Sequence, residues 1–395
     1  MEICTTGKCT ACGSCVYKCP KQGISIKNNE YGIPVAMVDE AKCVQCGLCQ
    51  RVCPVSNPPA VHFPQACYAA WHKDDRKRAK SASGGIAAAL TEKCIASGGI
   101  VYGAAYQNHS FSLCRADALE QAESFAGSKY VQCNVGNAYR EVAEDLKKRK
   151  KVLFIGTPCQ NAGLLAAVGA HENLLCIDLI CHGVPAQGYL QDYIKEILHR
   201  DFSECKMISF RDAEGWNIKV QNCNSQIIYQ KSHQLDQYYK AFLNGTTYRE
   251  NCYTCPWAQS NRVSDITLGD FWGLGVKESF AYPKEKVSVV LINTEKGNAF
   301  FETNSSEIVK VSRSIAEAID GNEQLRHPSL FGDDAKVFHN EIRGKSFLAA
   351  LKCTKAYKTV RKENIMQVVL AIVRSIVPRK IYECMKNCLE SIARR

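Results

Sequence analysis

The chain has 395 residues, of which 46% are hydrophobic and 23% charged, a globular balance that leaves room for two or three domains. Its 23 cysteines are the unusual feature. A secreted disulfide scaffold would be short and loop-rich, and the first ten residues lack the apolar core of a signal peptide. We therefore expect metal-binding cysteines in a reducing compartment, the cytoplasm.

The formal net charge of +11 is unevenly distributed. Residues 341–395 contain thirteen Lys and Arg against four Asp and Glu, so most of the excess lies in this last stretch. No pattern of basic and aromatic residues runs through the main body, and we therefore expect no nucleic-acid partner.

Eight cysteines near the N-terminus form an internal repeat with an offset of 34 residues. The two runs are Cys9, Cys12, Cys15 and Cys19, followed by Pro20, and Cys43, Cys46, Cys49 and Cys53, followed by Pro54. In a CxxCxxCxxxCP run three thiolates bind one [4Fe–4S] cluster and the fourth binds the other. We predict one cluster on Cys9, Cys12, Cys15 and Cys53 and a second on Cys43, Cys46, Cys49 and Cys19. Zinc would require a single set of four.

The elements that follow indicate an α/β body. Two short strands, Ile24–Ile26 and Tyr31–Val35, separate the cysteine runs, and four prolines over 54–64 mark the linker 56–66. Helical and strand patterns then alternate. They are a helix Ile86–Ser97, a strand Ile100–Tyr106, a helix Tyr139–Lys150, a strand Lys151–Ile155, a helix after Pro158 and a strand Leu174–Ile180. This alternation predicts a mostly parallel or mixed sheet.

The expected fold class is therefore α+β, with four parts. A dicluster ferredoxin-like module over 1–55 (the N-terminal module) precedes the linker 56–66, the body 67–335 and a basic helical tail 336–395. Within the tail, Ile365–Val377 resembles an amphipathic helix that is too short to span a membrane. It either packs on the body or makes peripheral contact with an anionic membrane surface, which would be the inner face of the membrane.

Four cysteines of the body stand in distinctive surroundings. Cys159 lies at a strand-to-helix turn, Cys181 follows the next strand, and Cys252 and Cys255 form a CxxC pair. Ends of adjacent parallel strands are where such sheets place their sites. By pattern alone these residues could hold a third cluster, hold zinc or remain free thiols. The other eleven cysteines are expected to be small buried residues.

Two loops are candidates for cofactor binding. Ser83-Gly84-Gly85 precedes a predicted helix, whose free N–H groups favour anions, although the same sequence can be a simple turn. Residues 269–273 place Asp270 between glycines and two aromatic residues. This loop could stack on a ring or merely pack.

The motifs taken together resemble the coenzyme F420 hydrogenase/dehydrogenase beta-subunit family, preceded by a two-cluster ferredoxin module. They occur in the order SASGG (81–85), GSKYVQ (127–132), GTPCQ (156–160), CHGVP (181–185), FRD (210–212), CYTCP (252–256) and DITLGDFWG (265–273). The resemblance covers roughly residues 1–280 and leaves out the basic tail.

The resemblance implies a flavoprotein that binds FAD, with a further [4Fe–4S] cluster in the same domain. Its ligands would be Cys159, Cys181, Cys252 and Cys255. The implied flavin contacts are Ser83, Gly84, Gly85, Lys129, Tyr130, Gln132 and Asp270. Cys133 stands where the family leads us to expect a serine. His182 and Lys129 are the candidate proton donors, and for each the alternative role is a hydrogen bond that anchors the cofactor.

Three functions follow from this reading. The first is a self-contained oxidoreductase, in which clusters carry single electrons and FAD pairs them for transfer as a hydride. Its partners would be an electron donor such as ferredoxin and a small-molecule or glycan-linked substrate, with coenzyme F420 as a further candidate. The second is an electron-transfer subunit whose partner subunit performs the chemistry. The third is a membrane-bound redox adaptor that depends on the basic tail.

Overall fold

The computed structural model describes residues 2–5, 7–211 and 215–376. Its N-terminal module contains two short helices, α1 (Ser14–Lys18) and α2 (Leu48–Arg51), and an antiparallel hairpin of β1 (Ile24–Asn28) and β2 (Pro34–Val38). The two expected strands are confirmed, but β2 begins three residues late. The Asn29 side chain accepts N–H groups of Tyr31 and Ile33, which makes these residues part of the turn.

An eight-stranded mixed sheet forms the centre of the body, in the order β13-β3-β12-β11-β7-β6-β4-β5. Its strands are β3 (Ala66–His72), β4 (Ile100–Gln107), β5 (Ser110–Ala116), β6 (Val152–Gly156), β7 (Leu174–Leu179), β11 (Ile266–Asp270), β12 (Ser288–Ile292) and β13 (Ile308–Arg313). The four central strands β11, β7, β6 and β4 are parallel, and the flanking pairings are antiparallel. The expected parallel alternation is therefore confirmed for the centre of the sheet.

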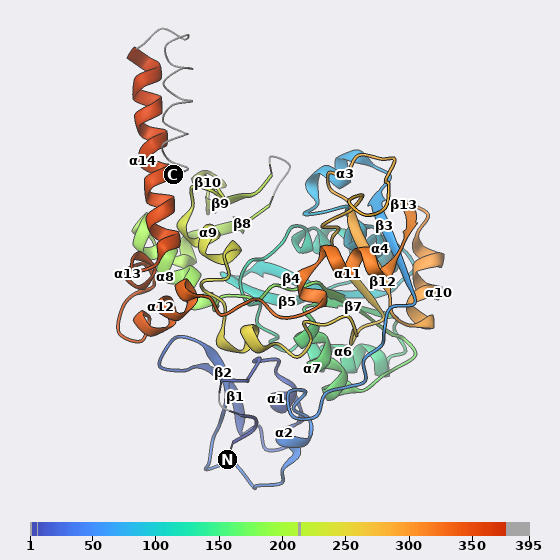
Figure 1. Ribbon diagram of the computed structural model, residues 1–395. Coiled ribbons are helices and arrows are strands. Elements are labelled where there is room, and N and C mark those ends of the chain that lie inside the picture. Colours follow the sequence, from blue (N-terminus) through green and yellow to red (C-terminus); the bar gives the residue numbers. More distant parts are fainter. Residues whose placement is uncertain (1, 6, 212–214, 377–395) are drawn as a thin grey trace.

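Helices cover both faces of this sheet (Figure 1). On one face α4 (Ile86–Ala96) and α10 (Glu295–Asn304) pack on the alternate side chains of the central strands. On the other face lie α6 (Ala138–Lys147), α7 (Pro158–Val168) and α11 (Ile315–Gly321). The inner strands thus bury both faces, which explains the nearly continuous apolar runs in β6, β7 and β12.

A second lobe is built around aromatic side chains. It contains the antiparallel sheet β10-β9-β8, of β8 (Cys205–Ser209), β9 (Asn217–Asn222) and β10 (Ile227–Ser232). Its helices are α8 (Gln187–Leu198), α9 (Gln237–Leu243), α12 (Asp333–Glu341) and α13 (Phe347–Lys352). Phe338 and Phe347 are fully buried in its core. The expected boundary at 335–336 therefore falls inside α12, and the first part of the expected tail belongs to the body.

Helix α14 (Lys355–Ile376) continues this lobe and then projects from it (Figure 1). Val360 is fully buried, and the Asn364 amide donates to the carbonyl of Leu235 at 2.9 Å. The expected amphipathic stretch Ile365–Val377 lies in the outer part of α14 and ends outside the described residues. Within the described ranges, no helix is long and apolar enough to cross a membrane.

Short elements complete the chain. They are α3 (Asp75–Lys80), α5 (Leu119–Ala122) and the 3-10 turns η1 (Glu123–Phe125), η2 (Phe202–Glu204), η3 (Glu250–Thr254) and η4 (Glu323–Leu325).

Candidate redox sites

Four cysteines of the repeat line one cavity of the N-terminal module, the first cysteine cavity: Cys9, Cys12, Cys15 and Cys53. Three of them come from the loop that enters α1, and Cys53 follows α2. Ala11 and Gly13 adopt left-handed backbone angles, with φ of 53° and 82°. These two reversals curl the loop so that its thiols face one space, which is how a short CxxCxxC spacing can surround a cluster.

The other four cysteines line the second cysteine cavity: Cys19, Cys43, Cys46 and Cys49. Gln45 and Gly47, with φ of 53° and 70°, repeat the left-handed positions of the first loop. Cys46 is exposed to solvent, and so is the neighbouring Val44. The cysteines are therefore grouped three and one between the two runs, and the second cavity reaches the protein surface.

In neither cavity do the thiols meet at a point. Among the described residues, no three His, Cys, Asp or Glu side chains are close enough together to hold a single metal ion. Four thiols spread around a cavity suit a cluster, whose own iron and sulfide atoms fill the space between its ligands.

A fifth thiol, Cys4, also lines the first cysteine cavity. Its hydrogen bonds with Cys9 and Cys53 lower the pKa of these two thiols, to about 5 and about 6. Sequence reasoning missed this residue because its counterpart in the repeat, 34 residues later, is Val38.

The remaining unpatterned cysteines divide into three groups. Cys67, Cys94, Cys133, Cys176 and Cys205 are buried, as expected. Cys114 and Cys353 are half-buried, and Cys223 is exposed, which corrects the expectation for that residue because the β9–β10 turn faces solvent. Cys384 and Cys388 lie outside the described residues.

The body brings its four patterned cysteines together as the third cysteine group: Cys159, Cys181, Cys252 and Cys255. Cys159 is the second residue of α7, Cys181 follows β7, and Cys252 lies in η3. Burial raises the pKa of the Cys181 thiol, and the nearby Cys252, Cys159 and Cys255 raise it further. Burial also raises the pKa of Cys255 to about 12, again with Cys159 and Cys252 contributing. Four thiols from separate segments of the sequence are therefore half-buried near one another, and Cys159 and Cys255 pack on the same apolar cluster.

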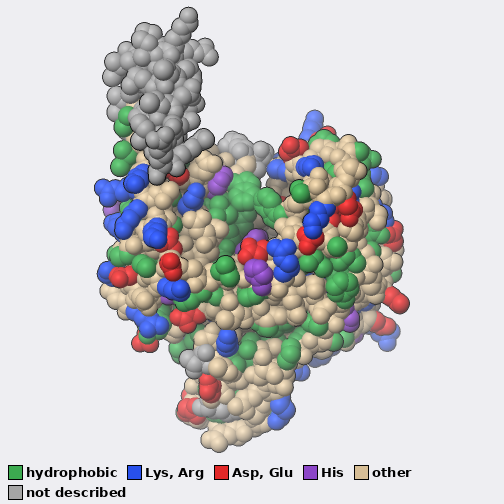
Figure 2. Space-filling model, viewed as in Figure 1, with side chains coloured by type: hydrophobic (Ala, Val, Ile, Leu, Met, Phe, Trp, Pro, Cys, Tyr) green, Lys and Arg blue, Asp and Glu red, His purple; other side chains and the backbone are tan. Residues whose placement is uncertain are grey.

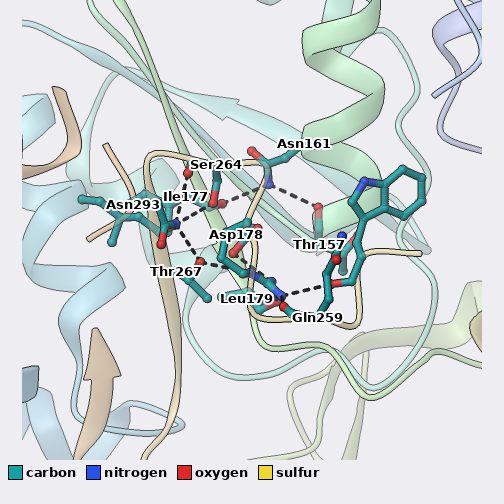
Figure 3. Close-up of polar contacts among 12 residues, drawn as sticks. Thr157, Asn161, Ile177, Asp178, Leu179, Gln259, Ser264, Thr267 and Asn293 are labelled. Carbon is teal, nitrogen blue, oxygen red and sulfur yellow. Dashed lines mark hydrogen bonds and ion pairs between the residues drawn. The ribbon is translucent and has the colours of Figure 1, made fainter. Parts of the chain in front are cut away.

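A buried polar network holds the loops that carry these cysteines (Figure 3). Arg262 pairs with Asp178 at 3.1 Å, with side chains 1% and 0% exposed. The same guanidinium donates to the carbonyls of Trp257, Gln259 and Leu179. The segment after Cys255 is thus fastened to the end of β7, just before Cys181.

The Asn161 amide performs the same task for α7. It donates to the carbonyls of Gly156, Thr157 and Ile177, so the helix that bears Cys159 is tied to the ends of β6 and β7 (Figure 3). The Gln160 side chain accepts the Thr157 N–H at 2.9 Å and closes the first turn of the helix.

The first cysteine cavity and the third cysteine group are neighbours. The Ser14 hydroxyl donates to the Gly163 carbonyl of α7 at 2.8 Å. A Cβ on Gly163 would lie only 2.7 Å from the Cβ of Cys12, so the glycine allows α7 to approach the first loop. Val55 packs beside Cys159 and Cys255. The N-terminal module is therefore in direct contact with the part of the body that holds the third group.

A second group of contacts, the Arg211 centre, forms around Arg211, which follows strand β8. Its guanidinium pairs with Asp270 at 3.0 Å, donates to the carbonyl of Ala82, and lies 3.9 Å from the ring centroid of Trp216. The loops at 81–85, 127–130 and 269–273 thus converge with the chain that follows β8. Figure 2 shows a hollow with hydrophobic side chains in its wall between the second lobe and the half of the body that carries α3 and β13.

Two family models match this chain. Residues 8–57 match a 4Fe–4S dicluster domain, and residues 149–316 match the C-terminal part of the beta subunit of coenzyme F420 hydrogenase/dehydrogenase. Residues 149–316 are thus similar to the C-terminal part of this beta-subunit family of oxidoreductases, and they follow an N-terminal iron–sulfur dicluster domain.

No curated protein matches the chain in sequence. Among solved structures, a chain of the F420-reducing [NiFe] hydrogenase complex from Methanosarcina barkeri, studied by xenon derivatization, is 16% identical. The match covers 71% of this chain and 93% of that chain, with a TM-score of 0.45.

The expected flavin contacts lie in different places. Tyr130 stacks on Phe242, with 4.3 Å between the ring centroids. Burial raises the pKa of its hydroxyl, the positive charge of Arg211 opposes this rise, and the negative charge of Asp270 adds to it. Gln132 instead is buried and directs its amide to the carbonyl of Thr10 in the N-terminal module, at 3.4 Å. Tyr130 and Asp270 therefore belong to the Arg211 centre, whereas Gln132 lies at the contact between module and body.

Lys129 has a structural environment that its motif did not predict. Its ammonium donates to the carbonyls of Ser124, Phe125, Ala126 and Gly127 at 2.7–3.1 Å. Burial lowers its pKa to about 8. With its protons committed to the carbonyls of one turn, Lys129 fixes the loop before Tyr130.

The two glycines of the 83–85 loop have different roles. A Cβ on Gly84 would lie 2.4 Å from the carbonyl oxygen of Ala70, and its N–H donates to the Ser288 hydroxyl at 2.9 Å. Gly84 therefore packs the loop on the sheet. Gly85, with φ of 83°, precedes α4, whose first turn has no side-chain cap. The first N–H groups of α4 therefore have no side-chain cap, and the anion site suggested by the sequence stays a prediction.

His182 directly follows Cys181 of the third cysteine group. The residue is partly exposed to solvent, and its carbonyl accepts the Ser329 hydroxyl at 2.7 Å. Desolvation by the surrounding protein lowers the pKa of its imidazole, which the negative charge of Asp270 opposes and the positive charge of Arg211 reinforces. His182 is therefore between the third cysteine group and the Arg211 centre.

Proposed function

We propose that this protein is an iron–sulfur flavoprotein oxidoreductase that exchanges single electrons at its N-terminal module and a hydride at FAD. The first and second cysteine cavities would hold the two clusters of the dicluster domain. The third cysteine group would hold a further [4Fe–4S] cluster. The observation that carries the proposal is the contact between Cys12 of the first cavity and α7, the helix that bears Cys159.

This contact gives the clusters an order. The second cysteine cavity is the outermost, because Cys46 is exposed and Val44 beside it is 57% exposed. The first cavity touches the body, and the third group lies inside it. Electrons from a donor such as ferredoxin would enter at the second cavity and pass through the first to the third. The reverse flow, from reduced coenzyme F420, would use the same path.

The Arg211 centre is the best-supported site for FAD. The uncapped start of α4, with Ser83 and Gly85, would bind the phosphates, because helix N-termini favour anions. Tyr130, Asp270 and Arg211 would orient the flavin. The flavin would supply the exchange between single electrons and a hydride. We assign Lys129 a positioning role and retain His182 as the candidate proton donor.

The two-electron acceptor would be a small molecule or a glycan-linked substrate. The hollow with hydrophobic walls between the second lobe and the half of the body that carries α3 and β13 would admit this substrate (Figure 2).

Iron and flavin analysis tests the proposal. Anaerobically reconstituted protein should contain about twelve irons per chain, since three [4Fe–4S] clusters are expected, and should release FAD on denaturation. The C252A/C255A variant should retain about eight irons. Protein that binds eight irons and no flavin under the same conditions would overturn the proposal.

The alternative function is that of an electron-transfer subunit in a larger hydrogenase or dehydrogenase complex. The exposed second cavity favours it equally, since a partner subunit could dock there as readily as a soluble carrier. Turnover by the purified chain alone would decide for the self-contained enzyme. A stable co-purifying partner, with no turnover in its absence, would decide for the subunit.

A further inference from the structure

A buried arginine lies at the contact between the N-terminal module and the body. Arg249 directly precedes η3 and is 2% exposed. Its backbone N–H donates to the carbonyl of Val184, and its own carbonyl accepts the N–H of Cys252. Its main chain is therefore part of the loops that carry the third cysteine group.

The side chain of Arg249 reaches the other way, into the N-terminal module. Nη1 donates to the carbonyl of Thr10 at 2.9 Å, and Nη2 donates to the carbonyls of Cys9 and Pro34, each at 2.8 Å. Thr10 and Cys9 belong to the loop of the first cavity, and Pro34 begins β2. One side chain thus binds both halves of the module to the body.

The charge of Arg249 has no carboxylate partner. Each acceptor of its guanidinium is a backbone carbonyl, and none of the ion pairs among the described residues includes it. Its Nε is buried and makes no hydrogen bond within the described part of the chain. A buried cation is costly unless a negative charge compensates it.

The cysteines of the two adjacent sites would supply this negative charge when they bind clusters as thiolates. On the side of the third group, the carbonyl of Arg249 accepts the N–H of Cys252 at 2.9 Å. On the side of the first cavity, the guanidinium of Arg249 donates to the backbone carbonyl of Cys9. Arg249 therefore lies between cysteines of the first cavity and cysteines of the third group.

We propose that Arg249 is a positioning residue that locks the dicluster module onto the body and raises the reduction potentials of both adjacent clusters. The inference rests on the proposed third cluster. Reduction adds one negative charge to a cluster, and a fixed buried cation stabilises the more negative state. The unpaired Nε–H would donate to a cluster or cysteine sulfur, which acts in the same direction.

Potentiometric titration of the holoprotein, followed by EPR, tests this role with the R249M variant. We expect the first and third clusters to become harder to reduce by at least about tenfold in equilibrium constant, which is about 59 mV for a one-electron couple. The second cluster should be unchanged, because Arg249 contacts no residue of its cavity.

Arg51 provides a matched control. It also donates to the carbonyl of a cysteine, that of Cys46 at 3.1 Å, but it is exposed, so water screens its charge. R51M should leave all potentials unchanged. Unchanged potentials in an R249M protein with a full iron content would overturn the inference and leave the proposed function intact. Wild-type protein with only eight irons would instead overturn the proposed function.

The R249K variant covers the case in which R249M does not fold. Lysine keeps the charge but cannot reproduce the planar, forked set of bonds to three carbonyls. We expect near-normal potentials but faster proteolysis in the linker 56–66, as the module detaches. Normal protection of the linker in R249K would overturn the locking role.

Discussion

At the scale of single residues, the ion pair of Arg262 and Asp178 is the most deeply buried one among the described residues. Both side chains are fully buried, and Arg262 also serves three carbonyls around the third cysteine group. Removing one partner leaves an uncompensated buried charge, whereas an exposed pair is screened by water.

We therefore expect R262Q to lose about 3–5 kcal/mol of unfolding free energy and part of its iron. Chemical denaturation and iron analysis measure the two effects. The matched control is K277Q, which breaks the exposed pair Lys277–Asp320 and should cost less than about 1 kcal/mol. Equal losses in the two variants would contradict the role assigned to the network.

Cys4 poses a second question at this scale, because five thiols line a cavity that needs four. The repeat identifies Cys53 as the ligand and leaves Cys4 as its hydrogen-bonding neighbour. C4A should then retain the iron content of the wild type, and C53A should lose one cluster. Iron analysis of both variants decides the matter, and the opposite pattern would make Cys4 the ligand.

At the scale of elements, helix α7 connects the two parts of the molecule. Its N-terminal turn carries Cys159, and one turn later Gly163 faces Cys12 of the N-terminal module. Tyr139 of α6 closes the same contact, since a Cβ on Gly163 would lie 2.6 Å from its hydroxyl oxygen. Helix α7 can carry Cys159 and also approach Cys12 only if position 163 has no side chain.

G163A should therefore displace the first loop and reduce the iron content or the magnetic coupling between clusters, as measured by EPR of the reduced protein. G188A, in the helix α8, is the control. Its nearest contact would be 3.7 Å away, so the added methyl group should be neutral or slightly stabilising. Wild-type coupling in G163A would argue against close packing of the module on α7.

At the scale of the whole molecule, the N-terminal module and α14 lie at opposite ends of the body (Figure 1). Membrane contact through the basic tail would thus leave the exposed second cavity open to a carrier. A truncation at residue 360 would remove most of the basic residues of the tail and would be the simplest test of this contact. The structure makes that cut unsuitable, because Val360 is fully buried and Asn364 bonds to the β10–α9 connection.

A truncation that ends at Ile376 avoids this damage. If the tail binds membranes, the truncated protein should no longer sediment with anionic vesicles, while its thermal unfolding stays at the wild-type temperature. Retained sedimentation would exclude residues 377–395 as the membrane-binding element.

The sequence by itself determined the local features. Within each CxxCxxCxxxCP run, the short spacing predicted which three cysteines share a cavity, because left-handed positions such as Gly13 and Gly47 act within one loop. The fourth cysteine comes from the other run, and its assignment rested on the repeated motif. The alternation of helix and strand predicted the parallel centre of the sheet, since apolar periodicity is also local. Both predictions can be made without knowing any contact between distant segments.

Only the tertiary structure decided how the parts meet. Arg249 and Gly163 carry no sequence signal for their partners Thr10 and Cys12, which are more than a hundred residues away. Lys129 and Gln132 share one motif, yet one binds its own turn and the other faces the module. Such roles depend on which surfaces pack together, and packing between distant segments is not encoded in any local spacing.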